Sequence, residues 1–221
     1  MEISYLGHSC FRIRGRDTAI VTDPFSNKYG YPMGKPQAGI VTLSLRDGDD
    51  SADHTNVDGV GGEPRVVDGP GEYEISDILI YGVRTAVRDE SAKEGGYRLN
   101  TVYVMDVDDI RVCHLGELAD VLTADQIEAI GNVNVLMVPV GGGPTIGAKR
   151  AVEVISQLEP NLVIPMHYRI AGTRSENLDP VDRFINEMGA KSIEPVPKVT
   201  LNAKNSLPSD IQITVMESKR G

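Results

Sequence analysis

The first half of the chain carries short apolar runs separated by Gly, Pro, Asn and Asp. Runs of this kind, rich in Val, Ile and Thr, are typical of β-strands that end at turns. The last two runs flank the polar segment DVDDI at 106–110, which predicts a tight antiparallel hairpin. The expected strands of this half cover residues 3–6, 10–13, 19–22, 40–44, 79–83, 101–106 and 110–114.

The spacing of apolar residues becomes helical after residue 123. Thr123 has Gln126 three positions on, which is the capping-box pattern of a helix start, and a glycine stop follows. Residues 148–158 also show helical spacing, and Asp179 is expected to cap a third helix. Strands are expected at 133–140, 162–165, near 199 and at 211–215. The second half therefore predicts strands that alternate with helices.

The composition is that of a folded globular chain, with 40% hydrophobic and 24% charged residues among 221. This length predicts one domain that spans residues 1–221. The 22 Lys and Arg against 32 Asp and Glu give a net charge of −10. Because such a charge repels phosphate backbones, we expect no nucleic-acid partner.

Two segments and the cysteine count bear on the compartment. The start MEISYLGHSC lacks the basic region of a signal peptide, and the longest uncharged run, at 129–148, is interrupted by Pro and Gly. Two cysteines are too few for a disulfide scaffold and suit a reducing environment. We therefore expect a cytoplasmic protein that has no membrane partner and takes a small-molecule substrate or ligand. Its assembly into a homo-oligomer stays open.

The histidines stand at the ends of expected strands or beside glycine turns, where functional side chains are common. Asp53 precedes one of them, and Glu117 follows another by three positions. Imidazole and carboxylate groups suit Zn²⁺, iron or manganese. A structural hydrogen bond explains each histidine alone, but together they make a metal site a candidate, although spacing alone does not decide. The four are His8, His54, His114 and His167.

Several ordered segments carry a family resemblance. YLGHSCFRI, IVTDPFS, PRVVDGPGEYEI, CHLGEL, LMVPVGGGPTI and VIPMHY follow one another across almost the whole chain. In this order they resemble the predicted zinc-dependent hydrolases of the metallo-β-lactamase superfamily, in the branch similar to L-ascorbate-6-phosphate lactonase. The resemblance implies an α+β fold, the αββα sandwich, with two face-to-face sheets and helices outside. It also implies a metal site at one edge, where strand-end loops meet.

The first metal motif of the superfamily, His-x-His-x-Asp-His, is degenerate in this chain. Alignment directly from the strand that ends at Ser44 puts Leu45, Asp47, Asp49 and Asp50 at the four ligand positions. Alignment on the segment HTNVDGV instead keeps Asp53 and His54, with Asp49 and Ser51 where histidines belong. The second alignment is preferred because the matching sequence resumes at His54.

The remaining ligand positions are only partly kept. The next superfamily histidine falls at Val87 or Arg88, the bridging aspartate is Glu117, and the last histidine is His167. One metal position is thus without its three histidines, whereas the other keeps the set Asp53, His54, Glu117 and His167. The resemblance implies one Zn, Fe or Mn ion at most, or none. It implies a mononuclear hydrolase of low or altered activity, in which Asp53 or Glu117 is the catalytic group that orients the attacking hydroxide.

A non-catalytic protein that keeps the fold for ligand binding or assembly is the alternative. In that protein Arg88 would fill the vacant metal position and pair with Asp49 or Asp89. Two further candidates, His8 and His114, match superfamily positions outside the usual ligand set. They either orient a substrate or form structural hydrogen bonds.

A glycine-rich loop raises a third class of function. The segment GGGPTIG at 141–147 lies between a strand and a helix, which is the layout of a phosphate-binding loop. Lys149 is not followed by Ser or Thr, and Pro144 removes one backbone donor. We therefore expect a turn near the site and no nucleotide.

Overall fold

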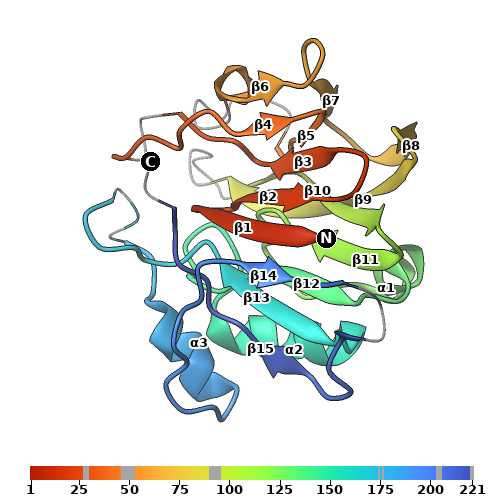
Figure 1. Ribbon diagram of the computed structural model, residues 1–221. Helices are drawn as coiled ribbons and strands as arrows, with labels where there is room; N and C mark the ends of the chain where they lie inside the picture. The colour runs from red at the N-terminus through yellow and green to blue at the C-terminus, as the bar shows by residue number, and fades with distance from the viewer. Residues whose placement is uncertain are drawn as a thin grey trace.

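Two β-sheets lie face to face, and the α-helices lie outside one of them (Figure 1). This computed structural model describes residues 1–26, 30–45, 53–89, 96–173, 175, 177–202 and 206–219. One sheet has six strands in the order β14-β1-β2-β3-β5-β7, and the other has seven in the order β15-β13-β12-β11-β10-β9-β8. The predicted α+β sandwich is confirmed in this arrangement.

The elements follow the expected order along the chain. The strand expected at 79–83 covers Ile78–Asp89 and the strand expected at 101–106 covers Gly96–Val107, whereas the other expected strands and helices recur with small shifts at their ends. The strands Arg65–Val67 and Gly71–Ile75 were not expected. The six-stranded sheet is built from β1 (Glu2–Gly7), β2 (Cys10–Arg14), β3 (Ala19–Thr22), β5 (Ile40–Thr42), β7 (Arg65–Val67) and β14 (Val199–Thr200). The seven-stranded sheet is built from β8 (Gly71–Ile75), β9 (Ile78–Asp89), β10 (Gly96–Val107), β11 (Ile110–His114), β12 (Val135–Pro139), β13 (Leu162–Met166) and β15 (Gln212–Ile213). The helices are α1 (Ala124–Ile130), α2 (Ala148–Leu158) and α3 (Val181–Glu187), and β4 (Gln37–Ala38) pairs with β6 (Asp58–Gly59).

Alternation of side chains along the first strands gives the six-stranded sheet two apolar faces. Tyr5 and Phe11 belong to the main core between the sheets, whereas their near neighbours Leu6 and Cys10 belong to a second, smaller cluster. This is the period-two pattern of a strand buried on both faces. Phe25, from the segment after β3, completes the smaller cluster on the outer face of the sheet.

The strands β11, β12 and β13 run parallel and are linked through α1 and α2. Every residue of β12 and β13 is buried, which explains why their sequences are continuous apolar runs. Because the carboxyl ends of parallel strands meet at one edge, the loops after β11, β12 and β13 come together there. This edge carries the candidate site.

The helix ends confirm one predicted cap and correct another. Thr123 caps α1 and forms the predicted capping box with Gln126. Asp179 was expected to cap α3, but the cap residue is Pro180 and no side chain caps this helix. The Asp179 carboxylate instead pairs with Arg183 at 2.7 Å, one turn along. The expectation failed because an ion pair competed for the same carboxylate.

Membrane-spanning helices are not found in the part of the chain that the structure describes, since no helix there is both long and apolar enough.

Candidate metal centre

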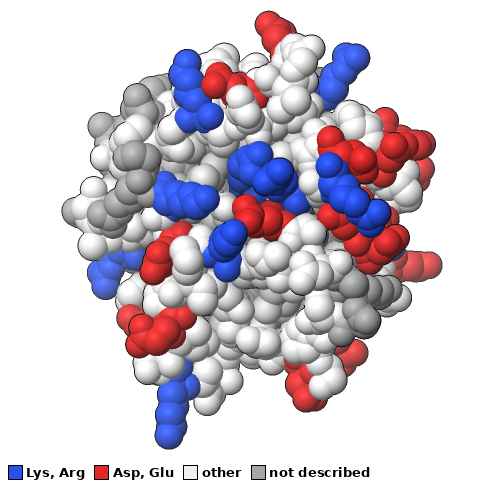
Figure 2. Space-filling model, viewed as in Figure 1, with Lys and Arg blue, Asp and Glu red and all other residues white. Residues whose placement is uncertain are grey.

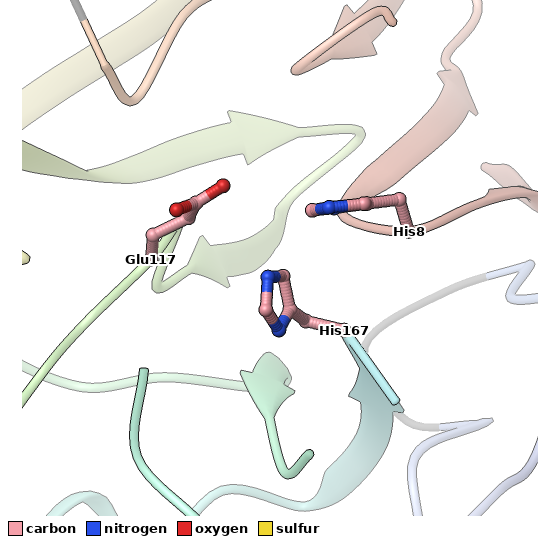
Figure 3. Close-up of side chains that lie close together, drawn as sticks. All are labelled: His8, Glu117 and His167. Carbon is pink, nitrogen blue, oxygen red and sulfur yellow. The ribbon is translucent and has the colours of Figure 1, made fainter. Parts of the chain in front are cut away.

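Three potential metal ligands converge at the shared edge of the two sheets (Figure 3). His8 follows β1 of the six-stranded sheet, while Glu117 and His167 follow β11 and β13 of the seven-stranded sheet. One ligand atom from each residue lies within 4.8 Å of the others. His167 is buried and the other two side chains are half-buried. Figure 3 shows the three side chains pointing toward one another.

The two histidines share an uncommon backbone conformation. His8 has φ 54° and His167 has φ 51°, both in the left-handed region. Such residues cost energy and gather at functional sites, where the surrounding structure holds them in place. The backbone N–H of His167 donates to the carbonyl of His8 at 2.9 Å. Their rings pack edge to face with centroids 4.4 Å apart.

A hydroxyl group contacts the Nδ1 atom of each ring. Nδ1 of His8 lies 3.1 Å from Oγ of Ser9, and Nδ1 of His167 lies 3.4 Å from Oγ1 of Thr145. The Thr145 hydroxyl donates to the carbonyl of Gly142 at 3.0 Å, which leaves its oxygen to accept from the ring. Histidines that bind metals are usually held in this way through the other nitrogen, which fixes the tautomer and the ring orientation.

Electrostatics favour a neutral imidazole at His8. Burial, together with the neighbouring His167, lowers the pKa of His8 well below its ordinary value of 6.5. Neutral imidazole is the form that ligates a metal.

The donor set fits a divalent metal ion. Two imidazoles and one carboxylate make up one of the three-ligand sets of catalytic zinc sites, where the fourth position is left to water. Iron and manganese also accept these donors. Among the described residues, no second group of three or more such ligands lies this close together.

The preferred alignment of the sequence assigns two other ligands to this site, and the converging group of the structure does not include them. The Asp53 carboxylate accepts from the backbone N–H of Thr55 and from Nδ2 of Asn56, each at 3.1 Å, and so caps a short 3₁₀ turn. His54 begins that turn, and its side chain is exposed. Neither residue belongs to the converging group, so their role as ligands stays a prediction.

The alternative with an arginine in the metal position is also left as a prediction. Arg88 is exposed near the end of β9, whereas its neighbour Val87 is buried in the core. Asp49 lies outside the described residues.

Four backbone N–H groups of the glycine-rich loop between β12 and α2 already donate to carbonyl groups of the protein. The N–H groups of Gly142, Thr145 and Ile146 donate to the carbonyls of Ile146, Gly142 and Leu118. The N–H of Gly141 donates to the carbonyl of His167. A phosphate-binding loop must present such groups to the anion, so this geometry favours the predicted turn.

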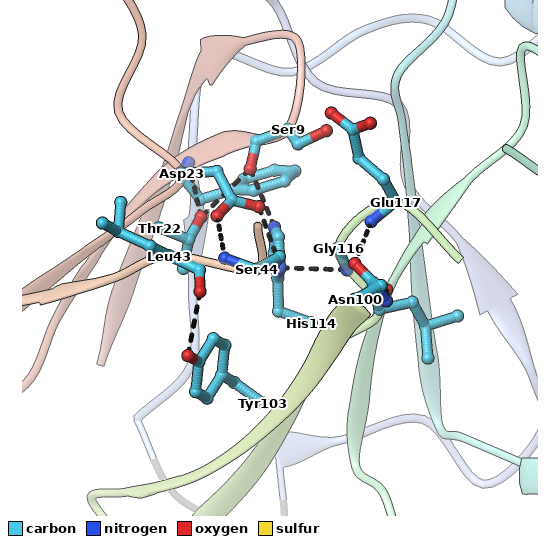
Figure 4. Close-up of polar contacts among 12 residues, drawn as sticks. Ser9, Thr22, Asp23, Leu43, Ser44, Asn100, Tyr103, His114, Gly116 and Glu117 are labelled. Carbon is cyan, nitrogen blue, oxygen red and sulfur yellow. Dashed lines mark hydrogen bonds and ion pairs between the residues drawn. The ribbon is translucent and has the colours of Figure 1, made fainter. Parts of the chain in front are cut away.

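Asn100 holds the loop that carries Glu117, a role that the sequence did not reveal. Its fully buried side chain donates to Oγ1 of Thr85 at 2.7 Å and to the carbonyl of Leu115 at 3.0 Å. Its Oδ1 accepts from the backbone N–H of Glu117 at 2.8 Å (Figure 4). An amide side chain directly before the run TVYVM, which is buried in the core, was the signal that could have pointed to this role.

His114 is the second buried polar residue beside the site (Figure 4). Its Nε2 lies 2.8 Å from the carbonyl of Ser9, and its Nδ1 accepts from the backbone N–H of Gly116 at 3.2 Å. Burial lowers its pKa below the ordinary value of 6.5, although nearby Asp23 and the Ser9 carbonyl oppose the shift. Both ring nitrogens of His114 therefore have hydrogen-bond partners.

This pKa predicts a loss of stability in weak acid. Below pH 6.5 the unfolded chain binds a proton at His114 that the folded chain does not, so the free energy of unfolding falls as the pH falls. The slope is at most about 1.4 kcal/mol per pH unit for one histidine. Urea unfolding between pH 7.5 and 5.5 measures it, and His114→Gln should have the shallower slope. An equal slope in both proteins would count against the buried neutral imidazole.

Comparison with known proteins places the chain in a family. A family model described as a beta-lactamase superfamily domain matches residues 2–167. The chain therefore belongs to the metallo-β-lactamase superfamily.

Several similar proteins match this chain over most of its length. A UPF0173 protein of Pyrococcus furiosus is 26% identical over 220 residues, which cover 87% of this chain and 93% of that protein. A UPF0173 metal-dependent hydrolase of Thermococcus onnurineus is 24% identical over 194 residues, covering 76% and 84%. A crystal structure from Thermotoga maritima, described as a candidate Zn-dependent hydrolase of the superfamily, is 38% identical, covers 98% of both chains and has a TM-score of 0.79. A metallo hydrolase of Ignicoccus hospitalis, at 18% identity, coverage of 92% and 99% and TM-score 0.62, shares the fold.

Proposed function

We propose that this chain is a mononuclear metal-dependent hydrolase whose ion is held by His8, Glu117 and His167. The observation that carries the proposal is the convergence of two imidazoles and one carboxylate within 4.8 Å at the edge of the sandwich. Zinc is the ion that this donor set suits best, with iron or manganese as the other choices. The descriptions of the superfamily relatives as metal-dependent hydrolases support the same activity.

Each of the three residues has a definable task. A bound ion supplies a water of lowered pKa and polarises the bond to be cleaved. His8 and His167 present ring nitrogens whose direction is fixed by the contacts with Ser9 and Thr145. Glu117, anchored through its backbone by Asn100, supplies the carboxylate. The same carboxylate would orient the attacking water. Asp53 is less suited to this task because its carboxylate is engaged by Thr55 and Asn56.

The substrate proposed is a small molecule rather than a nucleic acid. The net charge of −10 opposes the approach of a polyanion. On the face drawn in Figure 2, acidic side chains lie beside the basic ones and gather at the right of the view. One basic side chain, Lys198, is neutralised by Glu2 at 2.7 Å.

The test is metal-dependent hydrolysis by the purified chain. Protein stripped with a chelator and dialysed would receive one equivalent of Zn²⁺, Fe²⁺ or Mn²⁺ and be assayed on lactones, thioesters, esters and phosphodiesters. We expect about one bound ion per chain, and hydrolysis that disappears on stripping, returns with metal and is lost in Glu117→Gln. Absence of both binding and hydrolysis would overturn the proposal. It would favour the non-catalytic alternative, which the missing histidines of the first metal motif support.

A further inference from the structure

The proposed ligands come from two different sheets, so their spacing depends on what joins the sheets at this edge. His8 belongs to the turn between β1 and β2 of the six-stranded sheet, whereas Glu117 and His167 belong to the loops that follow β11 and β13 of the seven-stranded sheet. Within the seven-stranded sheet, Asn100 already fixes the backbone of Glu117. The His8 turn is tied to the end of β13 by the backbone N–H of His167, which donates to the carbonyl of His8 at 2.9 Å. The remaining variable is the position of the His8 turn relative to the Glu117 loop.

One side-chain contact across this gap comes from His114. This residue ends β11 of the seven-stranded sheet, is fully buried and reaches the carbonyl of Ser9, the residue after His8, at 2.8 Å. The same carbonyl accepts from Oγ1 of Thr22 at 3.1 Å, but Thr22 belongs to β3 of the same sheet as the turn. Of these two donors, only His114 ties the turn to the other sheet.

The partners of His114 dictate which ring nitrogen carries the proton. A carbonyl oxygen can only accept, so Nε2 must donate to Ser9. A backbone N–H can only donate, so Nδ1 must accept from Gly116. One neutral tautomer satisfies both, and it joins the residue that follows His8 to the residue that precedes Glu117.

The surroundings leave this ring little freedom. The Asp23 carboxylate lies 3.8 Å from Nδ1 and accepts from the backbone N–H of Ser44 at 2.6 Å, as Figure 4 shows. Phe11 packs edge to face on the ring with centroids 6.0 Å apart. A ring whose position is restricted in this way can keep the distance between the His8 turn and the Glu117 loop constant.

We infer that His114 is a positioning residue that sets the distance between His8 and Glu117 by bonding across the two sheets. It touches neither a substrate nor the ion. The inference rests on the proposed function, because it assigns His114 to the geometry of that metal site. Its first consequence concerns metal affinity, since a ligand that drifts by a fraction of an ångström weakens coordination.

Two substitutions separate the bonds of His114. In His114→Gln, the amide nitrogen takes the place of Nε2 and can still donate to Ser9. In His114→Asn, the amide oxygen takes the place of Nδ1 and can still accept from Gly116, but the bond to Ser9 is lost. Val112→Ala, at a fully buried position of the same strand, serves as the control for a general loss of stability.

The readouts are the dissociation constant for Zn²⁺, by competition with a chromophoric chelator, and the visible d–d spectrum with Co²⁺. We expect His114→Asn to bind Zn²⁺ about 10–100 times more weakly with a changed Co²⁺ spectrum. We expect His114→Gln to stay within about threefold of the wild type, and Val112→Ala to keep affinity and spectrum while losing stability to urea.

The inference is overturned if His114→Gln is as weak as the asparagine variant, or if Val112→Ala loses affinity equally. If His114→Asn does not fold, His114→Gln alone decides, since a tenfold loss of affinity there contradicts the role of the bond to Ser9. A wild-type chain that binds no ion overturns the proposed function itself. A wild-type chain that binds zinc while His114→Asn binds it equally well overturns only the inference.

Discussion

Replacement of Gly116 by alanine is expected to destabilise the protein by roughly 2–5 kcal/mol. Gly116 has φ 58°, a left-handed conformation that costs other residues about 1–2 kcal/mol. A Cβ atom at this position would collide with Oγ of Ser44 and Oδ1 of Asn100. Overpacking of this kind adds about 1–3 kcal/mol. Urea unfolding of Gly116→Ala measures the total.

A matched control separates the two costs. Gly189, just beyond α3, has φ 71°, and a Cβ there would meet no atom of the described residues within 4 Å. Gly189→Ala should therefore lose only the backbone part, about 1–2 kcal/mol. If Gly116→Ala lost no more than Gly189→Ala, the packing described between the Glu117 loop, Ser44 and Asn100 would be wrong.

Zinc is expected to stabilise the wild-type chain and to have no such effect on His167→Ala. An ion that binds only the folded state adds about 2.7 kcal/mol at a concentration 100 times its dissociation constant. His167 is the buried member of the proposed ligand set, so its removal should leave two half-buried ligands that hold the ion weakly. Thermal unfolding with and without Zn²⁺ measures the difference.

The exposed histidine His54 provides the control for this prediction. His54→Ala should keep the full stabilisation by zinc, because His54 lies outside the converging group. A rise in the melting temperature of His167→Ala equal to that of the wild type would show that zinc binds elsewhere.

Local sequence patterns predicted the strands and helices whose formation depends on the spacing of apolar residues. The strand at Ile110–His114 and the helix at Ala148–Leu158 lie where alternation and helical spacing placed them. The predicted cap of α3 was wrong because the Asp179 carboxylate forms an ion pair with Arg183 instead. A sequence pattern for helix caps does not take such a competing ion pair into account.

The candidate site was harder to predict because it is made by contacts distant in sequence. Glu117 and His167 were identified from the resemblance to the superfamily, and the structure brings them together. His8 lies 109 and 159 positions away from them along the chain and follows a strand of the opposite sheet. No local sequence pattern predicts that the His8 turn lies at the same edge as these two residues. Asp53 and His54 match the motif by alignment, yet they cap and begin a 3₁₀ turn, because a short Asp side chain readily caps its own backbone.

The central claim is that one ion is bound by His8, Glu117 and His167, and X-ray absorption at the zinc edge tests it most directly. The complex with one equivalent of Zn²⁺ should show a shell of nitrogen and oxygen donors with two imidazoles. The account predicts that His8→Ala reduces this number to one and that His54→Ala leaves it at two. An imidazole count that falls in His54→Ala and persists in His8→Ala would contradict the account and favour the ligand set implied by the sequence alignment.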